Sequence, residues 1–344
     1  MRTPSNILIS RLSSIGDIIL TTPVVRAVHE NYPGARISFL VKKEFASLVQ
    51  YNSHIQQLII FDKKGGWEAL RQLKQRIREE NFDWYIDLHN NLRTNYLKLS
   101  TRFPEVSSYS KQSFRRWLLV KFGKNIFKEA KPVYLKYFDA VKHRNLVYDN
   151  RGTEVYFPSS ELQSLESRMR SDGMDTSSPI VVICPGASFS NKQWLPGRFG
   201  NVADSLVNEK QMQVVFLGGP NDTGLCDSIL SGMKNKAWNY AGQLSLLGSA
   251  ALLGKANAVI TNDSGMMHLA QSQNTPVVAI FGPTTKEMGF FPIETKSKVI
   301  EDKSVPCRPC TTKGLNYCPK KHFNCMNRIE AEEVYQAVMA LTRN

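Results

Sequence analysis

The chain has 344 residues, a length that suggests two domains of ordinary size. Hydrophobic residues make up 42% and charged residues 22%, with 21 glycines and 16 prolines, and this composition excludes collagen-like and disordered chains. No uncharged run has the character of a membrane span, and no signal-type apolar stretch precedes Arg11, so we expect a cytoplasmic protein.

Basic residues outnumber acidic residues by 44 to 30, which gives a formal net charge of +14. The excess is concentrated in residues 111–151, where eleven Lys or Arg residues stand against three Asp or Glu residues. Such a segment favours an anionic partner, namely nucleic acid, phospholipid headgroups or an acidic glycolipid. A solvated face that only keeps the protein soluble has the same composition.

Short apolar runs rich in Ile, Val and Phe alternate along the chain with longer amphipathic segments. In the first half we predict strands at 6–10, 36–41, 58–62 and 83–88, with helices over 17–30 and 67–80. In the second half we predict strands at 180–184, 214–218, 258–261 and 277–281, with helices near 198–209, 222–233, 245–254 and 264–273. This alternation predicts an α/β fold of two doubly wound, Rossmann-like domains that face each other across a cleft. We place the domains at 1–155 and 156–344.

In such sheets, ligands bind at the carboxyl ends of the strands, so the loops that follow the strands carry the functional prediction. After the first strand, Asp17 stands at the start of a helix. It either caps that helix or acts as a general base directed into the cleft. Gly-x-Gly-x-x-Gly is absent, which argues against a dinucleotide-binding dehydrogenase.

The second half has four loops that suit a nucleoside diphosphate. They contain Ser188 and Lys192 after the first strand, Asp222 after the second, Asp263, Ser264, Gly265 and His268 after the third, and Thr284 after the fourth. Amides at a helix start bind anions, and a lysine neutralises phosphate charge. Each loop alone is also consistent with an ordinary turn or helix cap, but together they predict a nucleotide-diphosphate pocket.

These motifs resemble, in order and spacing, those of the lipopolysaccharide heptosyltransferases of glycosyltransferase family nine. The resemblance is carried by Arg11-Leu-Ser-Ser-Ile-Gly-Asp17, Lys192-x-Trp194-x-Pro196 with Phe199, Gly218-Gly219, Asn262-Asp263-Ser264-Gly265 with His268, and Phe281-Gly-Pro-Thr284. It implies a GT-B fold and inverting transfer of heptose from ADP-heptose without a catalytic metal. It also implies that the N-terminal domain binds the acceptor and the C-terminal domain the donor.

Residue by residue, the resemblance implies that Asp17 is the base and Lys192 the donor-phosphate contact. It matches Asp222 to a ribose contact, and Asp263 to Gly265 to the diphosphate loop, with His268 one turn further on. An acceptor made of anionic lipopolysaccharide core sugars would explain the basic segment. We therefore expect acceptor contacts from Arg11, Arg93, Arg115, Arg116 and Lys121, and peripheral contact with the inner membrane through the aromatics among these charges.

Four of the six cysteines, Cys307, Cys310, Cys318 and Cys325, fall within a Cys-rich loop at 306–326, before a final helix over 329–341. In a reducing compartment this spacing predicts a structural zinc or iron site, with reduced thiols or adventitious disulfides as the alternative. A similar loop occurs in some members of the family.

Two other functions share part of this pattern. A nucleotide-sugar epimerase has the same two-domain architecture but needs no basic acceptor face. A basic nucleic-acid-binding protein explains the charge but gives the four loops no role, so we expect no nucleic-acid partner.

Overall fold

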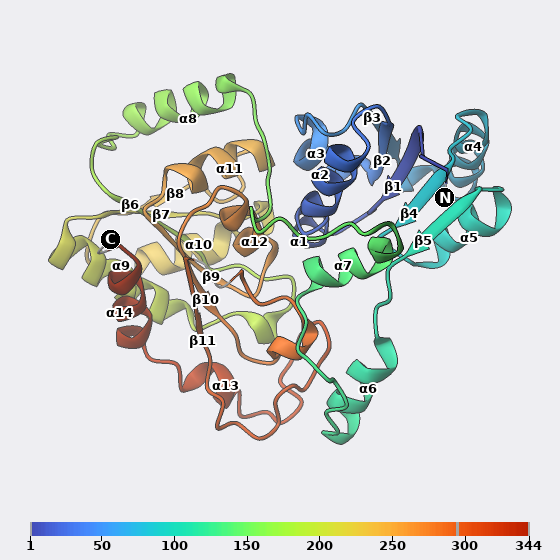
Figure 1. Ribbon diagram of the computed structural model, residues 1–344. Helices are drawn as coiled ribbons and strands as arrows, with labels where there is room; N and C mark the ends of the chain where they lie inside the picture. The colour runs from blue at the N-terminus through green and yellow to red at the C-terminus, as the bar shows by residue number, and fades with distance from the viewer. Residues whose placement is uncertain (1, 294–295, 343–344) are drawn as a thin grey trace. The chain divides into compact units, whose positions relative to one another are not determined.

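The computed structural model describes residues 2–293 and 296–342, so the outermost residues of both predicted domains, 1 and 343–344, lie outside the described residues. The described chain forms two α/β units, each built on one parallel sheet (Figure 1). The first unit comprises residues 1–112 and 133–156, and the second comprises 113–132 and 157–344. Within the described ranges, no helix combines the length and hydropathy needed to cross a membrane.

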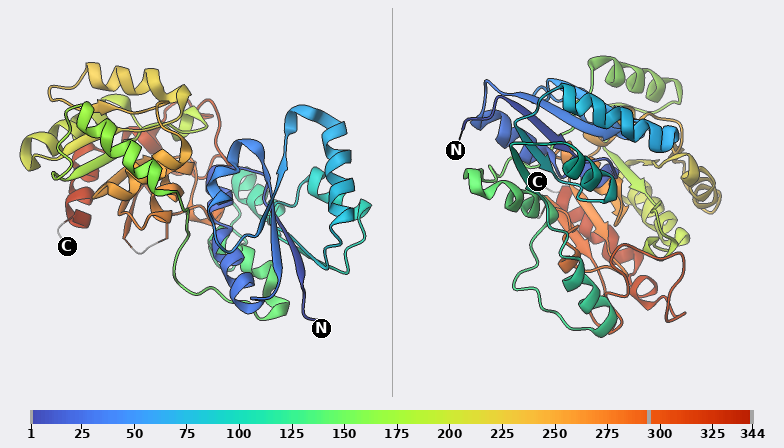
Figure 2. Two further views of the ribbon diagram at one scale, coloured as in Figure 1. Left: turned by 90° about the horizontal axis from the view of Figure 1, so that it is seen from above. Right: turned by 90° about the vertical axis from the view of Figure 1, so that its right-hand side faces the viewer.

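The first unit has a five-stranded sheet in the order β3-β2-β1-β4-β5. Its strands are β1 (Asn6–Ser10), β2 (Arg36–Lys42), β3 (Gln57–Phe61), β4 (Trp84–Asp87) and β5 (Glu105–Ser108). Its helices are α1 (Ile15–Ile19), α2 (Thr22–Asn31), α3 (Ser47–Gln50), α4 (Gly66–Glu79), α5 (Leu92–Ser100) and α7 (Val133–Val141), with 3-10 turns at Lys43–Phe45, Lys63–Gly65 and Lys142–Arg144. Helices α4 and α5 cover one face of the sheet, while α2 and α7 cover the other (Figure 2).

The second unit has a six-stranded sheet in the order β11-β10-β9-β6-β7-β8. Its strands are β6 (Ile180–Cys184), β7 (Gln213–Phe216), β8 (Trp238–Asn239), β9 (Ala258–Asn262), β10 (Val277–Ile280) and β11 (Ser297–Ile300). Its helices are α6 (Ser113–Phe122), α8 (Ser159–Ser171), α9 (Pro196–Lys210), α10 (Thr223–Ser231), α11 (Leu246–Lys255), α12 (Gly265–Ser272), α13 (Asn324–Asn327) and α14 (Ala331–Thr342), with 3-10 turns at Ser190–Lys192, Pro220–Asp222 and Lys286–Met288.

The predicted strands are all present, and most of them, such as β1, β6 and β9, are the buried apolar runs that a two-sided parallel sheet requires, whereas the edge strand β3 is partly exposed. Three strands were not predicted: β5, β8 and β11, each at or near a sheet edge, where short and partly polar segments suffice. The predicted helix over 17–30 is two helices, since Pro23 lies at the start of α2 and the chain turns between Leu20 and Thr22.

Residues 113–132, which the sequence assigned to the first domain, belong to the second unit. One face of α6 explains this placement. The guanidinium of Arg116 is buried and donates to the carbonyl of Met288 at 3.1 Å, and Leu119, one turn further on, is also buried. The chain therefore leaves the first unit after Gln112, returns at Val133 and leaves again after Tyr156.

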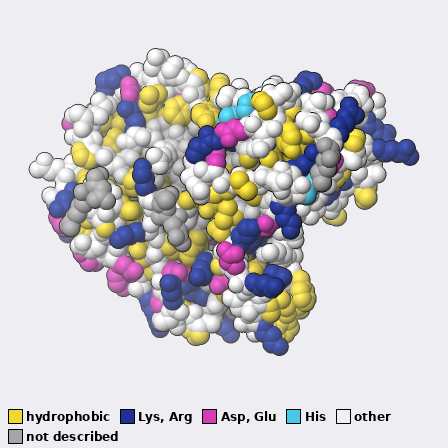
Figure 3. All heavy atoms as spheres, in the orientation of Figure 1, with side chains coloured by type: hydrophobic (Ala, Val, Ile, Leu, Met, Phe, Trp, Pro, Cys, Tyr) yellow, Lys and Arg dark blue, Asp and Glu magenta, His cyan; other side chains and the backbone are white. Residues whose placement is uncertain are grey.

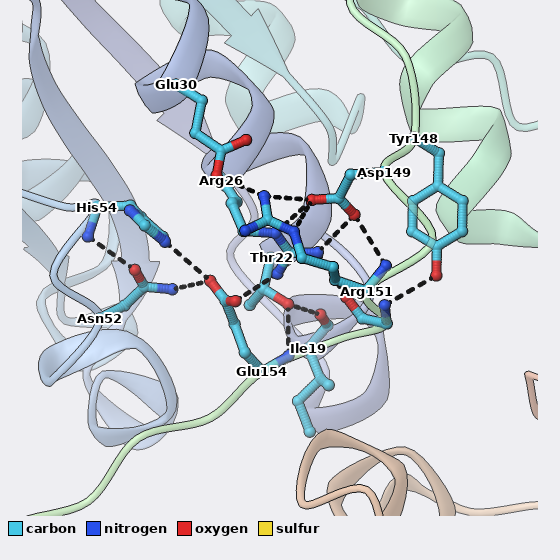
Figure 4. Close-up of polar contacts among 11 residues, drawn as sticks. Ile19, Thr22, Arg26, Glu30, Asn52, His54, Tyr148, Asp149, Arg151 and Glu154 are labelled. Atoms are coloured by element: carbon cyan, nitrogen blue, oxygen red, sulfur yellow. Dashed lines mark hydrogen bonds and ion pairs between the residues drawn. The ribbon is translucent and has the colours of Figure 1, made fainter. Parts of the chain in front are cut away.

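A buried arginine fixes the last stretch of the first unit, before the chain leaves it (Figure 4). Arg26 of α2 donates to both carboxylate oxygens of Asp149, at 2.7 and 2.9 Å, and also pairs with Glu154. The backbone amide of Glu154 donates to the hydroxyl of Thr22 at 3.0 Å, and its carboxylate accepts from Asn52 at 3.1 Å. Residues 149–154 are thus held against α2 by side chains on both sides.

Candidate functional site

The loop after β1 holds Asp17 in an ionised form. Its Oδ2 accepts hydrogen bonds from the Ser14 hydroxyl (2.9 Å) and amide (3.4 Å), and its Oδ1 lies 2.6 Å from Nη2 of Arg11. Burial alone raises the pKa of Asp17, but the charge of Arg11 and the Ser14 hydrogen bonds outweigh it and lower that pKa below its ordinary value. The carboxylate therefore caps α1 and also stays charged at the carboxyl edge of the sheet.

Arg11 is itself fixed from three directions. Nη1 donates to the carbonyl of Leu88 at 2.7 Å, Nε donates to the carbonyl of Ser13 at 2.9 Å, and the guanidinium lies 5.7 Å from the ring centroid of Tyr137 in α7. With this side chain buried and paired to Asp17, the structure gives Arg11 a role in setting the charge of Asp17. The sequence had assigned Arg11 only to acceptor binding.

The loop after β4 brings a histidine into the same electrostatic environment. The carboxylate of Asp87 accepts from the amides of His89 (3.0 Å) and Asn90 (2.8 Å) and pairs with Lys98 at 2.8 Å. Burial, together with the nearby charges of Arg11 and Lys111, lowers the pKa of His89 to about 3, so its imidazole is neutral. Its Nδ1 is buried without a hydrogen-bond partner among the described residues. Sequence reasoning missed His89, although the rule that selected Asp17 also applies to it, since His89 lies in the loop that follows β4.

In the second unit, three of the predicted donor residues meet. The ammonium of Lys192 lies 2.6 Å from Oδ2 of Asp263, and the same oxygen accepts from the Thr284 hydroxyl at 2.7 Å. These residues follow β6, β9 and β10, and all three side chains are largely buried. Together they place one cation, one anion and one hydroxyl at the carboxyl edge of the sheet.

Two further carboxylate and amide groups shape the same edge. Asn262 accepts from the amide of Trp194 at 3.0 Å and donates to the carbonyl of Pro185 at 2.7 Å, which ties the β6 loop to β9. Asp222 accepts from the amide of Gly219 at 2.8 Å and lies against Gly186, where an added Cβ would come within 2.3 Å of its carboxylate. A glycine at 186 is therefore what lets the β6 and β7 loops approach each other.

The remaining predicted donor residues have looser surroundings. Ser264 and Gly265 are partly exposed at the start of α12, where helix amides point outward, and Ser188 is exposed in the loop after β6. His268 is buried on α12, one turn after the helix start.

The predicted acceptor residues are divided between the two units. Arg93 is partly exposed in the first turn of α5, in the first unit. Arg115, Arg116 and Lys121 all lie on α6, in the second unit, where Lys121 is exposed and Arg116 is buried against Met288.

The four cysteines of the Cys-rich loop are free thiols. Across residues 2–293 and 296–342, no group of three or more His, Cys, Asp or Glu side chains is arranged to hold a metal ion, so the structure does not support the predicted zinc or iron site. Sulfur hydrogen bonds occur instead. The amide of Phe323 donates to Sγ of Cys318 at 3.4 Å, and Sγ of Cys307 lies 3.8 Å from Nε2 of His322.

The Cys-rich loop supports the donor residues directly. Asn191, next to Lys192, pairs twice with Leu315: its amide donates to the Leu315 carbonyl at 3.1 Å, and its Oδ1 accepts from the Leu315 amide at 2.8 Å. On the other side, Arg308 donates to the carbonyl of Thr284 at 3.1 Å. This connection was not visible in the sequence, because the partners lie far apart along the chain.

Comparison with known proteins identifies the family. Residues 70–320 match the model of glycosyltransferase family 9 (heptosyltransferase). The chain is 25% identical over 336 residues to lipopolysaccharide heptosyltransferase 1 of Pseudomonas aeruginosa, covering 95% of this chain and 92% of that protein.

Two solved structures are similar along the whole length. A family 9 glycosyltransferase from Veillonella parvula superimposes with a TM-score of 0.83 at 25% identity, covering 98% of this chain and 97% of that one. ADP-heptose lipopolysaccharide heptosyltransferase II of Escherichia coli superimposes with a TM-score of 0.75 at 21% identity, covering 98% of each chain. The two parallel-sheet units are those of a GT-B glycosyltransferase, as predicted. With both sheets, the loops at their carboxyl ends and the family model in agreement, the protein belongs to glycosyltransferase family 9, the heptosyltransferases.

Proposed function

We propose that this glycosyltransferase moves heptose from ADP-heptose to the inner core of lipopolysaccharide, with inversion at the anomeric carbon. The observation that carries the proposal is the family match over residues 70–320, which spans the loops of Lys192, Asp263 and Thr284. The Pseudomonas aeruginosa relative, named as a lipopolysaccharide heptosyltransferase, supports both the sugar and the acceptor class.

In the proposed reaction, an acceptor hydroxyl oxygen forms a bond to the anomeric carbon of heptose. The bond from that carbon to the diphosphate oxygen breaks, and its electron pair leaves with ADP. Asp17 takes the hydroxyl proton, because it is a charged carboxylate whose side chain remains 19% exposed. Attack on the face opposite the leaving group gives inversion.

On the donor side, we propose that the ammonium of Lys192 stabilises the charge that grows on the leaving diphosphate. Asp263 holds Lys192 in place through their 2.6 Å ion pair. Ser188, Ser264, Gly265, His268 and Thr284 complete the diphosphate surroundings, and Asp222 contacts the ribose.

On the acceptor side, we propose that anionic core sugars contact Arg11, Arg93, Arg115 and Lys121, with Arg116 fixing α6 from behind. The acceptor's lipid anchor would bring the protein to the cytoplasmic face of the inner membrane as a peripheral protein.

The test is incubation with ADP-heptose and a series of truncated lipopolysaccharide acceptors, followed by mass spectrometry. We expect a mass gain of one heptose on one acceptor. ADP release without an acceptor would contradict the proposal and indicate an epimerase. Binding of nucleic acid that weakens steeply with salt, without any transfer, would contradict it and indicate the nucleic-acid alternative.

A further inference from the structure

Helix α6 and the loop after it expose an unusual density of large apolar side chains. Phe114 is 66% exposed, Trp117 50%, Phe122 56% and Ile126 46%, all within thirteen residues. The rings pack on one another: Phe114 and Trp117 stack with centroids 6.0 Å apart, and Phe122 meets Trp117 edge-on at 5.2 Å. Exposed apolar groups scattered singly need no explanation, but a contiguous cluster indicates a binding surface.

The rings are exposed because the opposite face of α6 packs against the second unit. Arg116 and Leu119 hold the opposite face, since Arg116 donates to the carbonyl of Met288 and its guanidinium lies 5.8 Å from the ring centroid of Phe290. Phe114, Trp117 and Lys121 follow helical spacing and so project together from the outer face.

Positive charge surrounds the apolar cluster. Residues 113–132 contain six Lys or Arg residues and one Glu, and Lys121, Lys124 and Lys128 are all exposed. Figure 3 shows hydrophobic side chains gathered over α6, at the lower right of the view, with Lys and Arg side chains beside them. An apolar centre with a cationic rim is the pattern of helices that lie in the interface of an anionic bilayer.

We propose that residues 114–128, the α6 surface, bind an anionic lipid bilayer, with Phe114, Trp117, Phe122 and Ile126 entering the interface and the lysines contacting headgroups. A second copy of the chain fits less well, because two surfaces of net positive charge repel each other. Single-stranded nucleic acid stacks bases on open ring faces, whereas here the rings already pack against one another. This inference rests on the proposed function in one respect, namely that the lipopolysaccharide acceptor is anchored in a membrane.

The test measures binding of the full-length protein to vesicles without lipopolysaccharide or ADP-heptose, so that its outcome is separate from that of transfer. We expect flotation with vesicles rich in phosphatidylglycerol and weak flotation with phosphatidylcholine. Raising salt from about 0.1 M to about 1 M shortens the screening length from about 10 Å to about 3 Å and should weaken binding. With Trp67→Phe removing the other exposed indole, brominated lipid should quench Trp117 fluorescence.

Two variants separate the contributions. The aromatic variant Phe114→Ser/Trp117→Ser/Phe122→Ser should lose binding by at least about tenfold. The charge variant Lys121→Gln/Lys124→Gln/Lys128→Gln should lose about fivefold per lysine, about a hundredfold together. The matched control is Leu99→Ser/Tyr317→Ser, which removes side chains exposed by 90% and 64% outside the α6 surface and should bind vesicles normally.

Unchanged vesicle binding in the aromatic variant would overturn the inference, as would equal binding to both lipids. The inference would also be overturned if the wild-type protein did not bind vesicles but bound oligothymidine through the same side chains, so that the aromatic variant lost that binding; this result would indicate a nucleic-acid partner. Dimerisation of the wild-type protein in sedimentation equilibrium, lost in the aromatic variant and again without vesicle binding, would overturn it in favour of self-association. Transfer to a delipidated, water-soluble acceptor should persist in the aromatic variant. If the wild-type protein bound vesicles but transferred no heptose, the proposed function would be contradicted while the membrane-binding inference would stand.

Discussion

Asp17 combines two roles, since it caps α1 through Ser14 and carries a charge stabilised by Arg11. Asp17→Asn should lower turnover by about 10²–10⁴ because an amide cannot accept the acceptor's proton. Affinity for ADP-heptose should change little, because the donor residues lie in the other unit. Steady-state kinetics and isothermal titration measure the two effects.

Ser14→Ala is the matched control for the cap. It removes the 2.9 Å hydrogen bond but keeps the carboxylate and its ion pair, so it should cost about 1 kcal/mol of stability while turnover falls far less than in Asp17→Asn. Near wild-type turnover in Asp17→Asn would leave Asp17 as a helix cap only.

Arg11 sets the pH range in which Asp17 is charged. The pKa of Asp17 is lowered, so the carboxylate stays ionised as pH falls below about 4, where an ordinary aspartate takes up a proton. In Arg11→Met the counter-charge is gone and burial raises that pKa, so the acidic limb of kcat/KM should move to higher pH.

Arg11→Lys retains the charge and should leave that limb close to its wild-type position. Arg11 also lowers the pKa of His89, so a shift of the acidic limb in Arg11→Met could come from either residue. Measuring the pH profile of the double variant Arg11→Met/His89→Asn removes the contribution of His89. A limb that stays in place in Arg11→Met would show that Asp17 does not govern the acidic side of the profile.

Lys192→Ala should weaken ADP binding and slow the chemical step by about 10²–10³, since the charge on the diphosphate rises in the transition state. The variant also leaves Asp263 without its cation. Lys192→Ala/Asp263→Asn should therefore recover part of the ADP affinity but not the rate. If titration calorimetry and turnover were both unchanged, the donor site would lie elsewhere.

At the level of elements, the Cys-rich loop is attached to the donor edge by Arg308. Its guanidinium donates to the carbonyls of Phe281 (3.3 Å), Gly282 and Thr284 (3.1 Å) and pairs with Glu301 at 2.7 Å. Arg308→Ala should lower the free energy of unfolding by about 3–5 kcal/mol, because it leaves Glu301 and several carbonyls without a donor. The KM for ADP-heptose should rise as Thr284 loses its support.

Lys303→Ala is the control, because Lys303 is 83% exposed and lies 3.9 Å from the same Glu301 carboxylate. A surface pair of this kind contributes at most about 1 kcal/mol. Thermal denaturation compares the two variants, and equal losses would show that Arg308 does not hold the loop.

Some contacts between elements could be predicted from the sequence, and others could not. Asp263 and Thr284 were assigned to the donor site because they follow strands, and the structure brings them together with Lys192. The burial of Arg116 against Met288 could not be predicted, since a basic, aromatic segment reads the same whether one face is buried or not. Likewise, cysteine spacing fixes only which thiols are near in sequence, while metal binding depends on how a loop without regular structure folds.

At the level of the whole molecule, Arg26 stabilises the chain where it leaves the first unit. Arg26→Met should lower the free energy of unfolding by about 1–3 kcal/mol at neutral pH, because the partly buried Glu154 would lose its arginine and Asp149 would keep only the exposed Arg151 at 2.6 Å. Although burial raises it, hydrogen bonds from Arg26 and Arg151 lower the pKa of Asp149.

The sign of the pH effect follows from that shift. A lowered pKa contributes stability that is present above about 4 and is lost as pH falls towards the folded-state value. The difference between wild type and Arg26→Met in chemical denaturation should therefore shrink in acid. A difference that is constant with pH would show that the Asp149 pair contributes nothing.

Residues 113–132 belong to the second unit although they lie between two segments of the first, so the chain passes between the units three times. A cut in the exposed stretch around Lys124 would give one fragment that carries α6 and another that carries α7. Each unit would then be built from both fragments, because α6 packs in the second unit and α7 in the first. The nicked protein would behave as a single particle until it unfolds. For the same reason, no single cut point divides the chain into two complete, separately expressible domains.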